Sequence, residues 1–148
     1  MFMGIRLKIA ASALLLSAAT TLPLAAQVET PAAGSPLRTA ILDAVRPMVE
    51  AEVGGTVEFV VYDLRVLGEW AFVNLHPQRK GGGAIVWTYT RYQAQHDADA
   101  FDENVTALLR DTPAGWLVYQ YDLGATDASW VGWKDLYPAP PEVFPDGG

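Results

Sequence analysis

The sequence predicts an α+β domain: an N-terminal helix, kinked or divided at Pro47, packed on a curved antiparallel sheet of four or five strands, with a short C-terminal helix. Three observations predict this class. Apolar residues recur at helical spacing after residue 35, pairs of stretches rich in β-branched and aromatic side chains follow, and tryptophans return at helical spacing near the end. We expect one domain over residues 36–137, since about 100 residues suit a single core.

The first 26 residues are typical of a secretory signal peptide. Arg6 and Lys8 precede an uncharged run from Ile9 to Leu24, and Ala25-Ala26 offers small residues for cleavage. The run is shorter than the roughly 20 residues that cross a bilayer comfortably. We therefore expect export to the periplasm or the medium with no membrane span after cleavage; the alternative is an uncleaved anchor. Residues 27–35 show no apolar period and predict a flexible tether.

The N-terminal helix is predicted from Ser35-Pro36, a capping hydroxyl followed by proline at the first helical position. Pro47 lies inside the pattern and lacks an amide donor, so it should kink the helix or divide it. Gly54-Gly55 should end it. The apolar face is formed by Leu37, Ile41, Val45, Met48, Val49 and Val53.

A β-hairpin should follow, with strands at 57–66 and 70–75 around a turn at 67–69. By strict alternation, one face of its first strand carries Val60, Tyr62, Leu64 and Val66. After a mobile loop, residues 84–92 resume strand character and predict a further strand.

Residues 93–103 are polar and predict a long connection or a short exposed helix. A second hairpin is expected from strands at 105–110 and 116–123 around the turn Thr112–Gly115. Residues 129–137 should form a last helical turn. The Pro/Gly-rich tail, residues 138–148, should leave the fold extended or frayed.

Two stretches carry a resemblance to known proteins: residues 64–73 (LRVLGEWAFV) and 107–118 (ALLRDTPAGWLV), each a strand pair whose second strand begins at a tryptophan. They are similar to strand pairs of small exported bacterial proteins, and the overall shape resembles the cystatin-like or NTF2-like fold, in which a curved sheet grips one helix. The resemblance implies a concave face that either holds a ligand or is filled.

Charge and cysteine content exclude several classes. The formal net charge is −7, and removal of Arg6 and Lys8 with the leader makes it −9. An acidic surface repels phosphate backbones, so we expect no nucleic-acid partner. No cysteine is present, which excludes a disulfide scaffold and a lipidated-cysteine anchor.

His76 is the main candidate for acid–base chemistry, paired with Asp122 or Asp63, because imidazole titrates near neutral pH. The alternative is an inert histidine at a strand end. The cluster from His96 to Glu103 matches no calcium or zinc spacing and predicts a solvated loop. Gly81-Gly82-Gly83 leads into a predicted strand instead of a helix, unlike a phosphate loop. We therefore expect no metal and no cofactor.

Aromatic side chains supply the remaining binding candidates, which are Tyr62, Trp87, Trp130 and Trp133. Exposed, such residues anchor partners or wall a pocket; buried, they complete the core of a small domain without disulfides.

The sequence thus favours an exported, non-catalytic binding or accessory module of the bacterial cell envelope, with an envelope protein or a small ligand as partner and an oligomeric state that the sequence leaves open. The alternative is a small cone-fold enzyme, with a pocket lined by Tyr62, Trp87 and Tyr119 and an acid–base pair such as His76 and Asp122.

Overall fold

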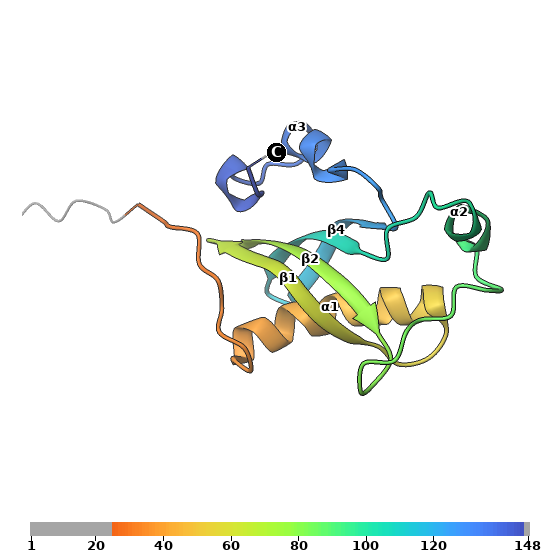
Figure 1. Ribbon diagram of the computed structural model, residues 1–148. Helices are drawn as coiled ribbons and strands as arrows, with labels where there is room; N and C mark the ends of the chain where they lie inside the picture. The colour runs from red at the N-terminus through yellow and green to blue at the C-terminus, as the bar shows by residue number, and fades with distance from the viewer. Residues whose placement is uncertain (1–24, 147–148) are drawn as a thin grey trace, which may run out of the picture.

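A computed structural model describes residues 25–146; the predicted signal peptide lies outside the described residues except for Ala25 and Ala26. It has three layers (Figure 1): a long helix, a four-stranded antiparallel sheet in the order β1-β2-β3-β4, and a C-terminal segment on the other side of the sheet. The α+β class is therefore confirmed. The helices are α1 (Pro36–Val53), α2 (Gln93–Asp97) and α3 (Trp133–Leu136), the strands β1 (Glu58–Leu67), β2 (Trp70–Gln78), β3 (Val105–Thr112) and β4 (Gly115–Leu123), and two 3₁₀ helices span Ser129–Gly132 and Pro141–Val143.

Helix α1 begins and ends as the sequence predicts. The Ser35 Oγ accepts a hydrogen bond of 3.3 Å from the Arg38 amide, and Gly54 caps the other end with φ 63°. Pro47 lies inside one unbroken helix, so the division into two pieces does not occur.

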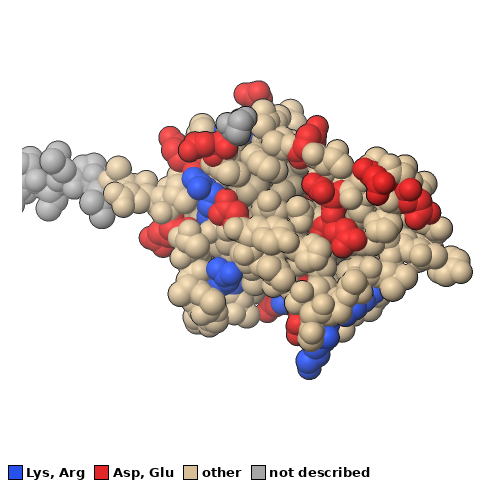
Figure 2. All heavy atoms as spheres, in the orientation of Figure 1, with Lys and Arg blue, Asp and Glu red and all other residues tan. Residues whose placement is uncertain are grey.

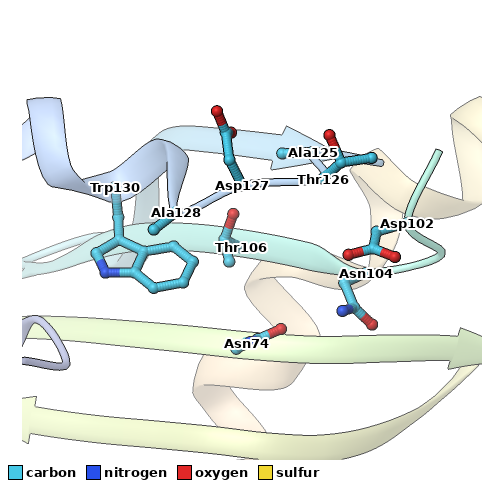
Figure 3. Close-up of a pocket in the computed structure, with 9 residues that line it drawn as sticks. All are labelled: Asn74, Asp102, Asn104, Thr106, Ala125, Thr126, Asp127, Ala128 and Trp130. Atoms are coloured by element: carbon cyan, nitrogen blue, oxygen red, sulfur yellow. The ribbon is translucent and has the colours of Figure 1, made fainter. Parts of the chain in front are cut away.

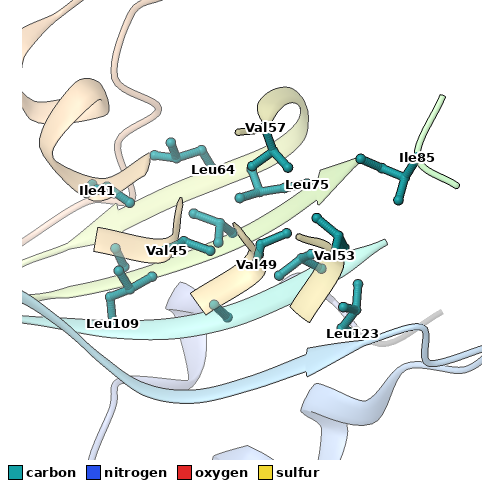
Figure 4. Packing of buried hydrophobic residues seen from close by; sticks show 14 of the residues in the cluster. Ile41, Val45, Val49, Val53, Val57, Leu64, Leu75, Ile85, Leu109 and Leu123 are labelled. Carbon is teal, nitrogen blue, oxygen red and sulfur yellow. The ribbon is translucent and has the colours of Figure 1, made fainter. Parts of the chain in front are cut away.

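The first core fills the space between α1 and the near face of the sheet (Figure 4). Four buried residues of α1, at spacings of four, meet alternate residues of all four strands. Its buried members include Ile41, Val45, Val49, Val53, Leu64, Val73, Leu75, Val105, Leu109 and Leu123.

A β-bulge in β1 breaks the predicted alternation. Val61 lies opposite Leu75 and Asp63 opposite Asn74, which leaves Tyr62 as the extra residue. Side chains before the bulge are therefore shifted by one position: Val60 is 39 % and Tyr62 59 % exposed, whereas Leu64 is buried. The prediction that these three residues share one face was wrong.

Residues 84–92 form an irregular loop, so the strand predicted there was wrong. Ile85 and Trp87 are buried at one end of the first core. The Trp87 ring lies 4.7 Å from that of Phe101, centroid to centroid. The alternating apolar residues Ile85 and Trp87, which suggested a strand, instead anchor this loop to the first core. Tyr89 between them and α2 has a φ of 69°, which no regular strand contains.

The C-terminal tail belongs to the fold, so the expectation that residues 138–148 leave it was wrong for the described part. Val143 and Phe144 are 0 % and 1 % exposed. Arg65 on β1 donates hydrogen bonds from Nε to the Val143 carbonyl at 3.0 Å and from Nη2 to the Glu142 carbonyl at 2.9 Å. The tail closes a second core on the back face of the sheet, formed by Leu67, Trp70, Phe72, Leu108, Trp133, Ala139, Val143 and Phe144.

The predicted tether is also partly anchored. Glu29 and Val66 exchange two backbone hydrogen bonds of 2.8 Å, an isolated bridge at the edge of β1. The Pro31 carbonyl accepts a bond of 3.1 Å from Arg38 Nη1. No helix within residues 25–146 has the length and apolar character needed to cross a membrane.

Candidate functional site

The candidate site is the part of the back face that the second core leaves uncovered. There a pocket of about 310 Å³ lies between strands β2 and β3 and the segment 125–128, which crosses above them (Figure 3). We call it the back-face pocket; it is lined by Asn74, Asp102, Asn104, Thr106, Ala125, Thr126, Asp127, Ala128 and Trp130.

Strand register places polar residues on the pocket floor. Asn74 lies opposite Thr106, and the next pair along the same face is Phe72 with Leu108, part of the second core. One face of β2 and β3 thus changes from apolar to polar within two residues. The change falls where the C-terminal segment that covers the second core no longer packs on the sheet.

The floor contains buried polar groups. Thr106 is only 5 % exposed, and its hydroxyl points toward segment 125–128 in Figure 3. The Asn74 Oδ1 is buried and accepts no hydrogen bond from any residue between 25 and 146. An unsatisfied buried acceptor costs about 1–3 kcal/mol.

Gly124 sets the height of the segment above the floor. Its amide donates to the Asn104 carbonyl at 2.9 Å, and its carbonyl accepts from the Asp102 amide at 3.1 Å. Its φ of 90° and the Phe101 ring, which occupies the place of any Cβ, both require glycine. The pocket wall is therefore held by backbone bonds.

The electrostatic character of the pocket is acidic. Asp102 and Asp127 line it, and no lysine, arginine or histidine does so. From Asp97 to Asp127 the chain has seven acidic residues and one basic residue, Arg110. Acidic side chains gather at the upper right of Figure 2, around α2, while basic ones lie below and to the left.

The predicted acid–base residues lie apart. His76 Nδ1 is 3.0 Å from the Glu103 carbonyl oxygen, and the His76 ring lies 6.1 Å from that of Tyr62, centroid to centroid. Asp122 is on β4, two strands from β2, a separation of about 10 Å at ordinary strand spacing. Asp63 lies opposite Asn74 on β1. The structure does not join His76 to either carboxylate, and none of the three lines the back-face pocket.

The predicted aromatic residues are distributed over the molecule. Trp130 alone among them lines the back-face pocket. Trp87 belongs to the first core and Trp133 to the second, at 2 % and 4 % exposure, so they are core residues. Tyr62 is exposed near the β1 edge.

A second polar cluster lies at the C-terminal end of α1. Glu52 Oε1 accepts hydrogen bonds from the Tyr121 hydroxyl at 2.9 Å and from Arg91 Nη2 at 2.6 Å. Burial, followed by this bond to Glu52, raises the pKa of Tyr121. The cluster ties α2 and β4 to α1.

The residues between 25 and 146 contain no group of three potential metal ligands close enough to hold an ion. His96 Nε2 lies 3.4 Å from a Glu103 carboxylate oxygen, which is a pairwise contact.

Sequence reasoning missed Asn74, Thr106, Asn104, Asp102 and Asp127. One signal was present: Asn74 and Thr106 are polar residues on the same strand face as Phe72 and Leu108, two positions away in each case. Only the structure shows that the covering segment leaves a space over them.

Comparison with known proteins gives no match: no family model, no curated protein and no solved structure is similar to this chain.

Proposed function

We propose that this chain is an exported binding module of the bacterial cell envelope, and that it holds a small polar ligand in the back-face pocket. The observation that carries the proposal is the polar floor of the pocket, where Asn74 and Thr106 lie side by side under a space of about 310 Å³. Two polar atoms of the lining, Asn74 Oδ1 and Trp130 Nε1, are buried without a hydrogen-bond partner among residues 25–146, and such groups call for an explanation.

The size of the pocket supports a small ligand. Its volume of about 310 Å³ is at the lower end of the roughly 300–1,000 Å³ usual for ligand cavities. A polar floor with Trp130 at one end also fits the usual division into orienting polar groups and an apolar wall.

The chemistry of the lining favours binding over catalysis. The pocket has no histidine, lysine, serine or tyrosine in its wall, and its two carboxylates lie on exposed segments. A general acid or base needs a reacting partner within hydrogen-bond reach, and His76 and Asp122 lie outside the pocket.

The contacts of the residues just after the predicted cut are compatible with export by cleavage. Glu29 is bonded to β1 three residues after the predicted cut at Ala26. A chain cut there would start beside the sheet edge and keep every core residue of the part that the structure describes.

Native mass spectrometry of the protein recovered from the envelope fraction of the producing cells tests the proposal. We expect a species cut near Ala26 that carries a reproducible extra mass. Ala128→Leu places a larger side chain in the pocket and should remove that mass. Ala94→Leu, on the exposed surface of α2, makes the same change outside the pocket and should retain it.

A bare, cut monomer in wild type and both variants would refute the tight-ligand form of the proposal. An extra mass retained by Ala128→Leu would place the ligand elsewhere. An uncut species would refute export by cleavage.

A further inference from the structure

We propose that Gln27 closes to an amino-terminal pyroglutamyl lactam once the leader has been cut after Ala26, and that this lactam blocks the end of the mature chain. The inference rests on the proposed export by cleavage. It follows from three features of the structure: how freely residue 27 projects, which charges lie near it, and how the next two residues are held.

Residue 27 is free to fold back on itself. Gln27 is exposed, and it takes part in no backbone hydrogen bond among residues 25–146. In Figure 1 this first part of the described chain, in orange, projects beyond the end of the sheet. The side chain and the new amine can therefore reach the geometry of a five-membered ring without breaking a backbone bond of the described chain.

The reaction needs only groups that Gln27 itself carries. The neutral α-amine attacks the side-chain carbonyl carbon Cδ, the new N–Cδ bond closes a five-membered lactam, and the Cδ–Nε2 bond breaks. Nε2 leaves as ammonia with the proton that the amine nitrogen gives up, so no oxidant or co-reactant is consumed. The attack has the advantage of an intramolecular reaction, and an α-amine with an ordinary pKa of about 8 is partly neutral at pH 7.

Two carboxylates limit how fast the folded protein can react. Glu29 and Asp111 line the same hollow as Gln27, beside Trp116. They attract the ammonium form of the new terminus and so disfavour the neutral amine that attacks Cδ. Both residues are exposed, and exposed ion pairs are weak, so we expect them to slow the reaction by no more than about fivefold.

The lactam protects contacts that begin one residue later. Val28 packs against the second core, and Glu29 exchanges two backbone hydrogen bonds of 2.8 Å with Val66 at the edge of β1. An aminopeptidase removes residues in order from a free amine, so after Gln27 it would take Val28 and then Glu29. A lactam has no primary amine from which such an enzyme can start.

A pulse–chase experiment in the producing cells tests the inference. Mature protein is recovered from the envelope fraction after a short pulse and after a long chase, both samples are handled identically, and the amino-terminal peptide is analysed by tandem mass spectrometry. We expect a peptide that starts at residue 27 and becomes lighter by the mass of one ammonia during the chase. Gln27→Asn is the matched control, because its side chain is one methylene shorter and would need a strained four-membered ring; it should keep its linear mass.

The synthetic peptide of residues 27–34 (QVETPAAG) measures what the fold contributes. Its cyclisation gives the rate of an end that nothing holds, and the freshly pulsed, folded protein in the same buffer should react within about fivefold of that rate. After the chase, an aminopeptidase should remove residue 27 from Gln27→Asn and no residue from the wild type.

A mature chain that still starts at a linear Gln27 after the chase, or that starts at another residue, would overturn the inference and leave export standing. Cyclisation far below the stated range, or trimming of the chased wild type, would also overturn it, because the amine would then be held or free. An uncut chain would refute export and the inference together. A lactam on a protein without extra mass would support the inference and count only against the pocket ligand.

Discussion

Gly124 offers the sharpest test of how the pocket is built. The backbone there has a φ of 90°, and the Phe101 ring stands where a side chain would begin. A non-glycine residue in left-handed backbone costs about 1–2 kcal/mol. Forcing an extra carbon into packed surroundings costs a further 1–3 kcal/mol or so. We therefore expect Gly124→Ala to lower the free energy of unfolding by about 2–5 kcal/mol.

Gly115 is a matched control, because its φ is 102° and no atom lies within 4 Å of the place of its Cβ. Gly115→Ala should cost only the backbone part, about 1–2 kcal/mol. Urea unfolding followed by tryptophan fluorescence measures both, provided that the m-values agree. The midpoint of thermal unfolding of Gly124→Ala should fall by at least about 8 °C, at the roughly 4–8 °C per kcal/mol of a domain this size.

Phe101→Ala completes the experiment. The Phe101 ring packs against Trp87 and Tyr92 at 4.7 and 5.2 Å between centroids, so its loss destabilises the first core by itself. In that background Gly124→Ala should cost no more than Gly115→Ala, because the ring that it meets is gone. Equal losses for the two glycine variants in the wild-type background would refute the reasoning.

Three further predictions concern the rest of the fold. Phe144→Ala should lower the free energy of unfolding by about 3–5 kcal/mol, whereas Leu136→Ala in the same segment, 72 % exposed, should change it little; equal effects in urea unfolding would exclude Phe144 from the core. Ser35→Ala removes the N-cap of α1 and should cost about 1 kcal/mol in the same assay; an unchanged midpoint would mean that the cap is dispensable. Burial and Glu52 raise the pKa of Tyr121 above its ordinary 10.0, so the stability it contributes is complete below pH 10 and is lost as pH rises further; Glu52→Gln should move tyrosinate absorbance to lower pH, and an unmoved titration would contradict this cause.

The two hairpins were predictable because their signals are local. Each pairs runs of β-branched and aromatic residues across a short turn, and the second strands begin at Trp70 and near Trp116 as expected. Helix α1 was equally predictable, from its N-cap at Ser35 and the helical spacing of its apolar residues. Short-range chemistry determines these elements.

The errors arise where burial depends on distant partners. Ile85 and Trp87 alternate like residues of a strand, but their segment pairs with no described strand and both side chains anchor a loop to the first core. Val143 and Phe144 lie in a proline-rich tail whose composition suggests fraying. Only the apolar back face around Phe72 shows that they have a surface to cover.

The bulge at Tyr62 and the back-face pocket could not be predicted from the sequence, for two separate reasons. A single extra residue in β1 changes which side chains face each way, and nothing in the composition of the strand signals it. The pocket depends in turn on where segment 125–128 crosses the sheet, which Gly124 and its contact with Phe101 decide. The spacing of apolar residues in the sequence predicts neither the bulge nor the position of segment 125–128.

The place of the tail in the second core has a consequence for the order of events during synthesis. Arg65 and the carbonyl of Val143 are 78 positions apart, so this contact waits until the chain as far as residue 143 has been made. A nascent chain with its first core assembled would still expose Phe72 and Leu108 to solvent until Val143 and Phe144 have been added. If the protein is exported before it folds, this late closure leaves the back face of the sheet accessible until the segment around Phe144 has been added.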